Sequence, residues 1–181
     1  MIIRDFQNGD ITACAALHKL SRRESEKGII FDEDLDRYDD DHFVQNWTEW
    51  EKYKETTILI AEDNDKIIGF VMFGKVKTRP PFDKGIVPKF GGEVYALYVH
   101  PDYFRKGIGK SLFLKACEGL STQNINSMIL WTLKKNKRAC AFYGSFDGAE
   151  RVGKKKVEMG KRSWAEESCF AWKDIRPLIN T

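Results

Sequence analysis

The segment "RKGIGKSL", Arg105 to Leu112, combines residue types that bind phosphate groups. Two glycines stand one residue apart, and Lys-Ser and an apolar helical stretch follow them. Glycine lets the backbone approach a ligand closely, and the free N–H groups at a helix N-terminus favour an anion. Positive charge at the same place comes from Arg105, Lys106 and Lys110. The segment therefore predicts a cradle for an anionic group.

Two well-known nucleotide loops do not match this segment. A Walker A loop needs glycine five positions before Gly109, where Phe104 stands. No acidic residue ends the later apolar run at residues 127–133, so the usual partner for Mg²⁺ is missing as well. The dinucleotide pattern fails because Leu112 occupies the place of its third glycine. An atypical P-loop-like phosphate site is the weak alternative, and binding of ATP with Mg²⁺ would support it.

Composition limits the class of protein. The chain has 181 residues with a net charge of +3, and 42% of its residues are hydrophobic and 31% charged. We expect one globular domain over residues 1–181, with neither nucleic acid nor membrane as a partner. No apolar run resembles a signal peptide or a membrane span, which predicts a cytoplasmic protein. The four cysteines and three histidines show no metal-binding spacing, so we expect no metal.

The elements that position the cradle follow from periodicity and punctuation. A strand at residues 1–6, a helix from Ile11 into the early twenties and a second helix over residues 43–54 come first. A hairpin is expected from residues 56–62 and 66–76, then a loop rich in proline and glycine over residues 77–92. The remaining expected elements are a strand at 93–100, a helix to about residue 120, a strand at 127–133, a helix at 137–146 and a strand at 168–175. This order predicts an α+β (α/β) mixed sheet.

Two longer segments resemble the motifs of one superfamily. "EVYALYVHPDYFRKGIGKSLF" (93–113) resembles the acyl-CoA motif of the GNAT acetyltransferases. "WTLKKNKRACAFYGSFDG" (131–148) resembles their second motif, with matching spacing at Asn136, Ala139, Phe142 and Tyr143. The resemblance implies the GNAT-like acyl-CoA N-acyltransferase fold, a mostly antiparallel central sheet flanked by helices. It also implies an N-acetyltransferase with acetyl-CoA as co-substrate, in a superfamily where homodimers are common.

The resemblance also implies binding roles for individual residues. The backbone of Leu97, Tyr98 and Val99 would pair with the pantetheine arm, and Asn136 lies in the matched second motif. The pyrophosphate cradle would consist of Arg105, Lys106, Gly107, Ile108, Gly109 and Lys110. Phe104 departs from the Gln or Arg that is usual there, and Arg105 is a candidate to replace that charge.

Acetyl transfer to a primary amine makes three physical demands: a held cofactor, a neutral amine and a stabilised leaving thiolate. An alkylammonium has a pKa of about 10.4, so a carboxylate must take its proton, and Glu93 is the candidate base. Tyr143 matches the tyrosine that relatives use to protonate the thiolate. Direct attack would form a tetrahedral intermediate whose oxyanion a strand N–H near Tyr98 or Val99 could hold. The alternative function is an acyl-CoA sensor or scaffold with this fold and no turnover.

Seven acids fall within ten residues between Asp32 and Asp41. Carboxylates in the first turn of a helix complement its dipole, which explains the last few of them. A local negative field would also attract a cationic amine. We therefore hypothesise a small-molecule or peptide amine that carries positive charge as the acceptor.

Overall fold

The computed structural model describes residues 1–77 and 89–179, so most of the loop expected over residues 77–92 lies outside the described residues. The strands are β1 (Ile2–Asp5), β2 (Thr56–Asp63), β3 (Lys66–Lys75), β4 (Gly92–Val99), β5 (Met128–Leu133), β6 (Glu150–Glu158) and β7 (Trp164–Trp172). The helices are α1 (Ile11–Glu26), α2 (Asp32–Leu35), α3 (Asp40–Glu51), α4 (Ile108–Thr122), α5 (Lys137–Gly144) and α6 (Arg176–Ile179), with short 3₁₀ turns at Asn8–Asp10 and Pro101–Tyr103.

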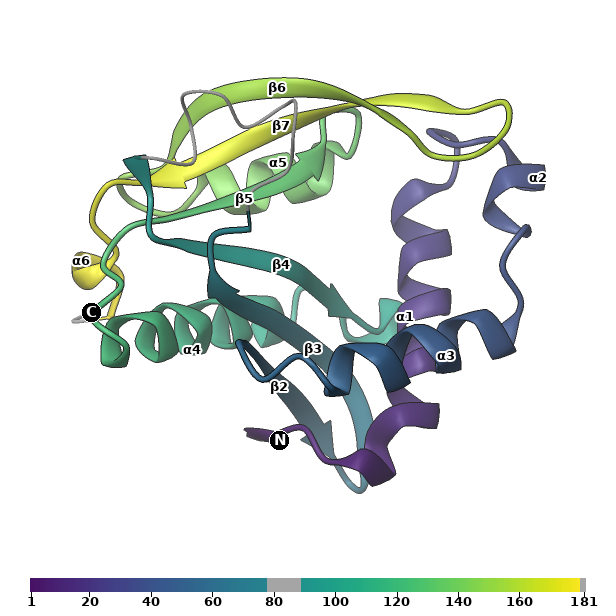
Figure 1. The fold of residues 1–181 in the computed structure, drawn as a ribbon, viewed down its shortest axis with the longest axis horizontal. Helices are drawn as coiled ribbons and strands as arrows, with labels where there is room; N and C mark the ends of the chain where they lie inside the picture. Colours follow the sequence, from purple (N-terminus) through teal and green to yellow (C-terminus); the bar gives the residue numbers. More distant parts are fainter. Residues whose placement is uncertain (78–88, 180–181) are drawn as a thin grey trace.

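The strands form one seven-stranded sheet in the order β1-β2-β3-β4-β5-β7-β6 (Figure 1). Among the described strands, β4 and β5 pair in parallel and the other neighbours are antiparallel. The mixed, mostly antiparallel sheet expected from the sequence is thus confirmed. The predicted helices and the 56–76 hairpin are present, with small shifts at their ends.

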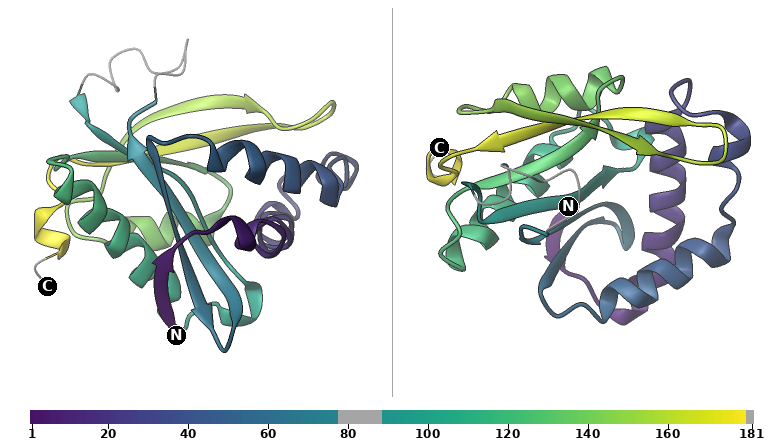
Figure 2. Two further views of the ribbon diagram at one scale, coloured as in Figure 1. Left: turned by 60° about the horizontal axis from the view of Figure 1, so that its bottom comes forward. Right: turned by 45° about the horizontal axis from the view of Figure 1, so that its top comes forward.

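Both faces of the sheet are covered, which explains the apolar run in β3. Phe70 and Met72 pack with α1 and α3, whereas Val71 and Phe73 alternate onto the face covered by α4. The left panel of Figure 2 shows the strands running between α4 and the pair α1 and α3. The helix α5 contributes Tyr143 to the α4 face. The sheet therefore separates two groups of helices. A ligand that contacts both faces of the sheet must lie where two neighbouring strands separate.

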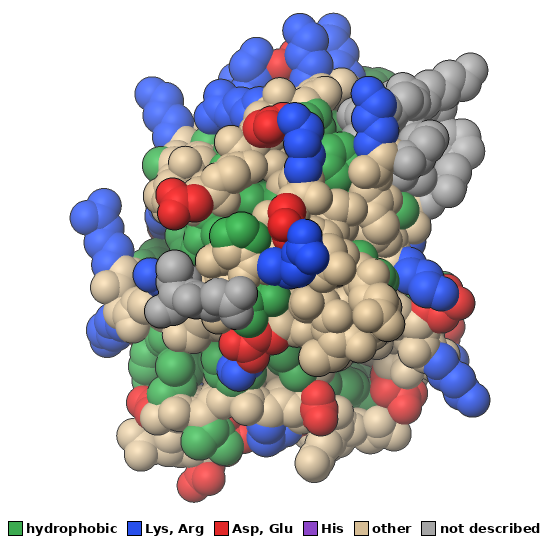
Figure 3. Space-filling model, turned by 90° about the vertical axis from the view of Figure 1, so that its left-hand side faces the viewer, with side chains coloured by type: hydrophobic (Ala, Val, Ile, Leu, Met, Phe, Trp, Pro, Cys, Tyr) green, Lys and Arg blue, Asp and Glu red, His purple; other side chains and the backbone are tan. Residues whose placement is uncertain are grey.

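The prediction missed β6, whose sequence "ERVGKKKVE" carries too much charge to read as a strand. Cross-strand pairing explains its stability, because Lys155 and Lys156 stand opposite Glu167 and Glu166 of β7. In Figure 3, Lys and Arg side chains gather along the edge that β6 and β7 form at the top of Figure 1. The apolar atoms on that face are broken up by charged side chains, and no wide apolar patch is visible there.

Candidate active site

The strands β4 and β5 part beyond their first three pairs. Their parallel pairing covers Gly92–Val94 and Met128–Leu130, while β4 continues to Val99 and β5 to Leu133. The divergence is visible in Figure 1. A cavity of about 630 Å³ fills this gap, lined by both strands, the end of α1, the start of α4 and α5. The parting of the strands thus opens a passage between the two faces of the sheet.

The backbone of β4 faces this gap at alternate residues. His100 N–H donates to Ile68 O, and Tyr98 stands opposite Phe70, so the backbone groups of these even positions face β3. Backbone groups of successive residues point to opposite edges of a strand, so those of Leu97 and Val99 face the gap. The Ser21 hydroxyl donates to Val99 O at 3.1 Å. The N–H groups available in the cavity are therefore those of Leu97 and Val99 rather than that of Tyr98.

The turn into α4 has the geometry of an anion cradle. Arg105 has φ 59° and Gly107 has φ 82°, both in the left-handed region, and Gly107 caps the helix. A turn that alternates left-handed and right-handed residues points successive backbone N–H groups toward one concave site, which can hold an anion. The first N–H groups of the helix also have no intrahelical acceptor. A Cβ added at Gly109 would lie 3.5 Å from Phe142 and 3.8 Å from Val99, two residues that line the cavity. Glycine at this position therefore keeps the cavity open beside the helix N-terminus.

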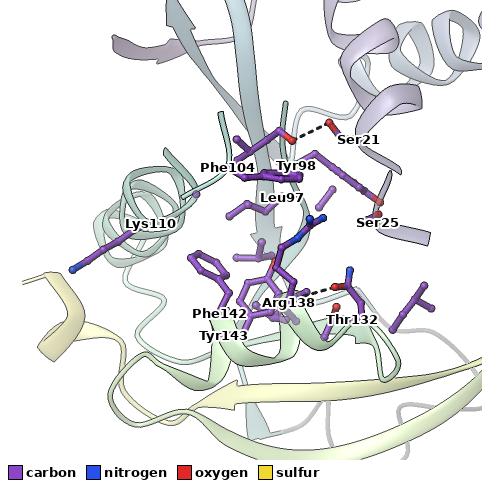
Figure 4. A pocket seen from close by; sticks show the side chains of 18 of the residues that line it. Ser21, Ser25, Leu97, Tyr98, Phe104, Lys110, Thr132, Arg138, Phe142 and Tyr143 are labelled. Atoms are coloured by element: carbon purple, nitrogen blue, oxygen red, sulfur yellow. Dashed lines mark hydrogen bonds between the residues drawn. The ribbon is translucent and has the colours of Figure 1, made fainter. Parts of the chain in front are cut away.

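The helix α5 supplies the opposite wall. Asn136 caps it by accepting a hydrogen bond from Ala139 N–H at 3.0 Å, and Asn136 also lines the cavity. Figure 4 shows Phe142 and Tyr143 of α5 across from Leu97 and Tyr98 of β4. Tyr143 is 7% exposed, and burial raises the pKa of its phenol. The Tyr143 hydroxyl thus stays protonated at neutral pH, as a proton donor must.

An arginine outside the predicted site stacks on Phe104. The Arg138 guanidinium lies 3.9 Å from the centre of the Phe104 ring, and both residues line the cavity. The arrangement brings a positive charge close to the position where a Gln or Arg was expected. Arg138 belongs to the basic run "KKNKR", but the sequence did not show that this residue, among four cations, would reach the cavity.

The structure does not bring every predicted residue to the cavity. Lys106 is absent from its described lining and instead lies over the Tyr103 ring, 4.7 Å from its centre. Glu93 is 1% exposed, is likewise absent from the lining, and accepts a hydrogen bond from Lys77 N–H at 3.1 Å. The other predicted residues, which are Tyr143, Leu97, Tyr98, Val99, Arg105, Gly107, Ile108, Gly109, Lys110 and Asn136, all line it.

A β-bulge explains the placement of Glu93. Met72 pairs with Ala96 but Phe73 pairs with Val94, so Tyr95 is an extra residue in β4. The bulge resets the alternation of side chains: Val94 packs on the α4 face, which turns its neighbour Glu93 to the other face. Simple alternation would have put Glu93 on the face of Leu97 and Val99. The role of Glu93 as the base remains a prediction that this placement does not support.

The profile of the "Acetyltransferase (GNAT) family" matches residues 15–147. This chain belongs to that family. The "Uncharacterized N-acetyltransferase YuaI" of Bacillus subtilis is 26% identical over 178 residues, which cover 97% of this chain and 95% of the relative. An uncharacterized N-acetyltransferase of Archaeoglobus fulgidus is 30% identical over 105 residues, 58% of this chain and 68% of the relative. Membership confirms the expectation of an acetyl-CoA-dependent GNAT N-acetyltransferase.

Two solved structures share the GNAT fold. The PaiA N-acetyltransferase of Thermoplasma acidophilum, in complex with coenzyme A, superposes with a TM-score of 0.68 at 18% identity and covers 94% of this chain and 97% of its own. The YncA protein of Salmonella typhimurium, with its cofactor acetyl-CoA, gives a TM-score of 0.66 at 16% identity over 94% of this chain and 92% of its own. The glycine-lined cradle and the open edge of β4 fit acetyl-CoA as the co-substrate of this GNAT chain.

The described part of the chain holds neither a metal-binding cluster nor a membrane-spanning helix. Within residues 1–77 and 89–179, no three His, Cys, Asp or Glu side chains are grouped closely enough to hold a metal ion. No helix in the same part of the chain has the length and apolar character needed to cross a membrane. All four cysteines are buried.

The acidic segment between residues 32 and 41 has mostly structural contacts. Asp34 is buried and accepts hydrogen bonds from the backbone N–H groups of Lys161 and Arg162, which fastens α2 to the β6–β7 turn. Asp39 caps α3, while the acids that form ion pairs are Glu33, Asp36 and Asp40. None of the seven acids is among the residues described as lining the cavity. The carboxylates described in the lining are instead Glu26 and Glu167, neither of which the sequence singled out.

Proposed function

We propose that this GNAT protein transfers an acetyl group from acetyl-CoA directly to the nitrogen of a primary amine. The observation that carries the proposal is the cavity between the parted strands, because one cavity contains the cradle, the free edge of β4 and the Tyr143 phenol. These parts meet two of the three demands of direct transfer, a held cofactor and a stabilised leaving thiolate. No nucleophile on the protein needs to be acetylated, and the buried Cys140 thiol has its pKa raised by burial, which disfavours the reactive thiolate.

The bound co-substrate would supply a thioester acetyl group and leave as a thiolate. The N–H groups of Arg105–Lys110 would bind its pyrophosphate, with Arg138 as a nearby cation. The gap-facing N–H groups of Leu97 and Val99 would pair with the pantetheine arm, and one of them is suited to bind the carbonyl oxygen as negative charge develops on it. Tyr143 would donate its proton to the departing sulfur.

The test of this function is ligand binding followed by turnover. CoA binds only the native state, so millimolar CoA should raise the melting temperature, and ATP with Mg²⁺ should leave it unchanged. Consumption of acetyl-CoA is then measured with a panel of small amines, polyamines, amino acids and peptides. A melting temperature that CoA does not move, or that only ATP raises, would refute the proposal and favour the phosphate-loop alternative.

The same experiments separate an enzyme from an acyl-CoA sensor. A sensor would be stabilised by CoA but would acetylate none of the amines, and the Tyr143→Phe substitution would change nothing measurable. An enzyme would lose turnover on this substitution while it kept its affinity for CoA.

A further inference from the structure

The cavity carries opposite charges on the two faces of the sheet. On one face, Arg105 lies in the turn before α4 and Lys110 in the first turn of that helix, together with Arg138 of α5. Glu26 is the last residue of α1, the helix that packs on the opposite face of β3 and β4. An anionic co-substrate and a cationic acceptor would therefore meet complementary charges from the two sides of the gap.

Glu26 is built into the cavity wall with one oxygen unused. It is 5% exposed and lines the cavity. Its Oε1 accepts a hydrogen bond from Arg22 Nε at 3.1 Å, whereas Oε2 is buried with no hydrogen-bond partner among the described residues. A buried carboxylate oxygen without a hydrogen-bond partner lowers the free energy of unfolding, because nothing replaces the hydrogen bonds to water that it has lost. An N–H group of a bound ligand would supply the missing partner.

Both acids of the cavity have a cationic partner. Glu167 of β7 pairs with Lys155 of β6 at 3.2 Å, and Lys155 in turn lies 4.0 Å from the centre of the Trp131 ring. Glu26 pairs with Arg22 at 3.1 Å, but only through Oε1. Of the two carboxylates described in the lining, Glu26 is the one whose second oxygen is buried without a hydrogen-bond partner among the described residues, so it has room for an N–H group of a bound amine.

On this basis we propose that Glu26 is the group that binds the acceptor ammonium and takes its proton. The proposal rests on the function proposed above and names the substrate class as primary amines that arrive as cations. A single carboxylate inside the cavity, and not the acidic segment between residues 32 and 41, would then attract the cationic amine. It also gives Glu26 the role that the sequence predicted for Glu93.

The proposed step moves protons between the amine, Glu26, Tyr143 and the sulfur. One ammonium proton passes to the Glu26 carboxylate, and the nitrogen lone pair forms the C–N bond while the C–S bond breaks. The sulfur takes the proton of Tyr143, and Tyr143 recovers one from the new amide nitrogen. Glu26 then releases its proton to water. The products are the acetamide, CoA as a free thiol and one proton in solution.

The charged groups that face Glu26 suit it to this step. Burial is the main reason why its pKa is raised, and the like charge of Glu167 adds to that effect, while Arg22 opposes it. The charge of Glu26 also contributes, after burial, to raising the pKa of Tyr98, which lies on the same cavity wall. A carboxylate with a raised pKa is a stronger base, and a general base works best when its pKa lies near the working pH.

Binding can be tested in the wild-type protein without turnover. The Glu26 side-chain carbon is followed by NMR in CoA-saturated protein labelled with ¹³C at glutamate Cδ, and the signal is assigned by its loss in Glu26→Gln. We expect a titration midpoint above the ordinary value for glutamate. The probe n-butylammonium should lower that midpoint, because an opposite charge favours the carboxylate, and n-butanol of the same length should not. A midpoint that n-butylammonium does not move at its highest soluble concentration would overturn the proposal.

The kinetic arm compares Glu26→Gln with a matched control. Glu24→Gln changes an exposed acid of the same helix. With the best amine of the panel, Glu26→Gln should lower kcat/KM by about 10²-fold or more and move the acidic limb of its pH profile up toward the pKa of the amine itself, because only the neutral amine can then react. Glu24→Gln should keep the wild-type kcat/KM and the wild-type limb. An acidic limb that stays at its wild-type position in Glu26→Gln, or that moves in Glu93→Gln instead, would refute the assignment.

The two proposals fail in different ways. If the wild-type protein acetylates no amine, the proposed function fails, and the NMR titration still decides whether Glu26 binds an ammonium. If amines are acetylated and Glu26→Gln is as active as Glu24→Gln, the function stands and the role of Glu26 is wrong. CoA-induced stabilisation of Glu26→Gln equal to that of the wild type shows that the variant is folded.

Discussion

Lowering the pH from about 8 to about 5 should destabilise this protein through His18, a buried residue behind the cavity wall. His18 is 8% exposed and lies among aromatic rings, 4.8 Å from Tyr98, 5.1 Å from Phe43 and 5.6 Å from Phe70 between ring centres. Its Nδ1 is buried without a hydrogen-bond partner among the described residues. Burial, with a smaller contribution from the charge of Arg22, lowers the pKa of His18 from 6.5 to about 3.

The sign and size of the effect follow from that shift. Between pH 6.5 and about 3 the unfolded chain binds a proton at His18 and the folded protein does not, so acid favours unfolding. The free energy of unfolding should fall by about 1.4 kcal/mol for each pH unit below 6.5, which gives about 2 kcal/mol at pH 5. For a chain of this size, that corresponds to a fall in melting temperature of about 4–8 °C.

The assay is urea or thermal unfolding of wild type and His18→Phe across this pH range. Phenylalanine keeps an aromatic ring in the cluster and removes the titrating group. Other groups, including Glu26, titrate in both proteins, so their contributions largely cancel in the difference. The wild type should lose about 2 kcal/mol relative to the variant by pH 5. Parallel pH curves for the two proteins would refute the reasoning, because His18 would then titrate normally or not at all.

Three further predictions concern the site and its support. Tyr143→Phe should reduce kcat by about 10²-fold or more with nearly unchanged CoA affinity, and wild-type turnover at saturating substrates would remove Tyr143 from the mechanism. Gly109→Ala should fold normally, since its methyl group meets only ordinary contacts, but should bind CoA at least about 10-fold more weakly by calorimetry. Gly9→Ala, in open space, is the control, and equal CoA affinities would mean that no ligand approaches Gly109. Asp34→Ala should melt below Asp32→Ala, because only Asp34 is buried and accepts backbone hydrogen bonds from the β6–β7 turn; equal melting temperatures would contradict that role.

The parts of the site that are built locally can be predicted from the amino-acid sequence. Gly107 adopts positive φ at low cost and precedes an apolar helical run, so the cradle could be predicted from its own residues. Asn136 caps α5 through a contact three residues away, and helical spacing then places Tyr143 on the packed face of the same helix. Motif resemblance joined these two segments and indicated the GNAT family. Each of these features depends on interactions between near neighbours in the chain.

Which carboxylate reaches the cavity depends on contacts between residues far apart in the chain. The bulge at Tyr95 exists because β3 and β4 pair with a shifted register, and it turns Glu93 away from the face that alternation assigns to it. Glu26 enters the cavity because α1 packs across β4, where Ser21 bonds to Val99 O. The charged strand β6 likewise forms because Lys155 makes an ion pair with Glu167 on β7. Strand register, helix packing and ion pairing join residues far apart in the chain, so no local pattern of residue types encodes them.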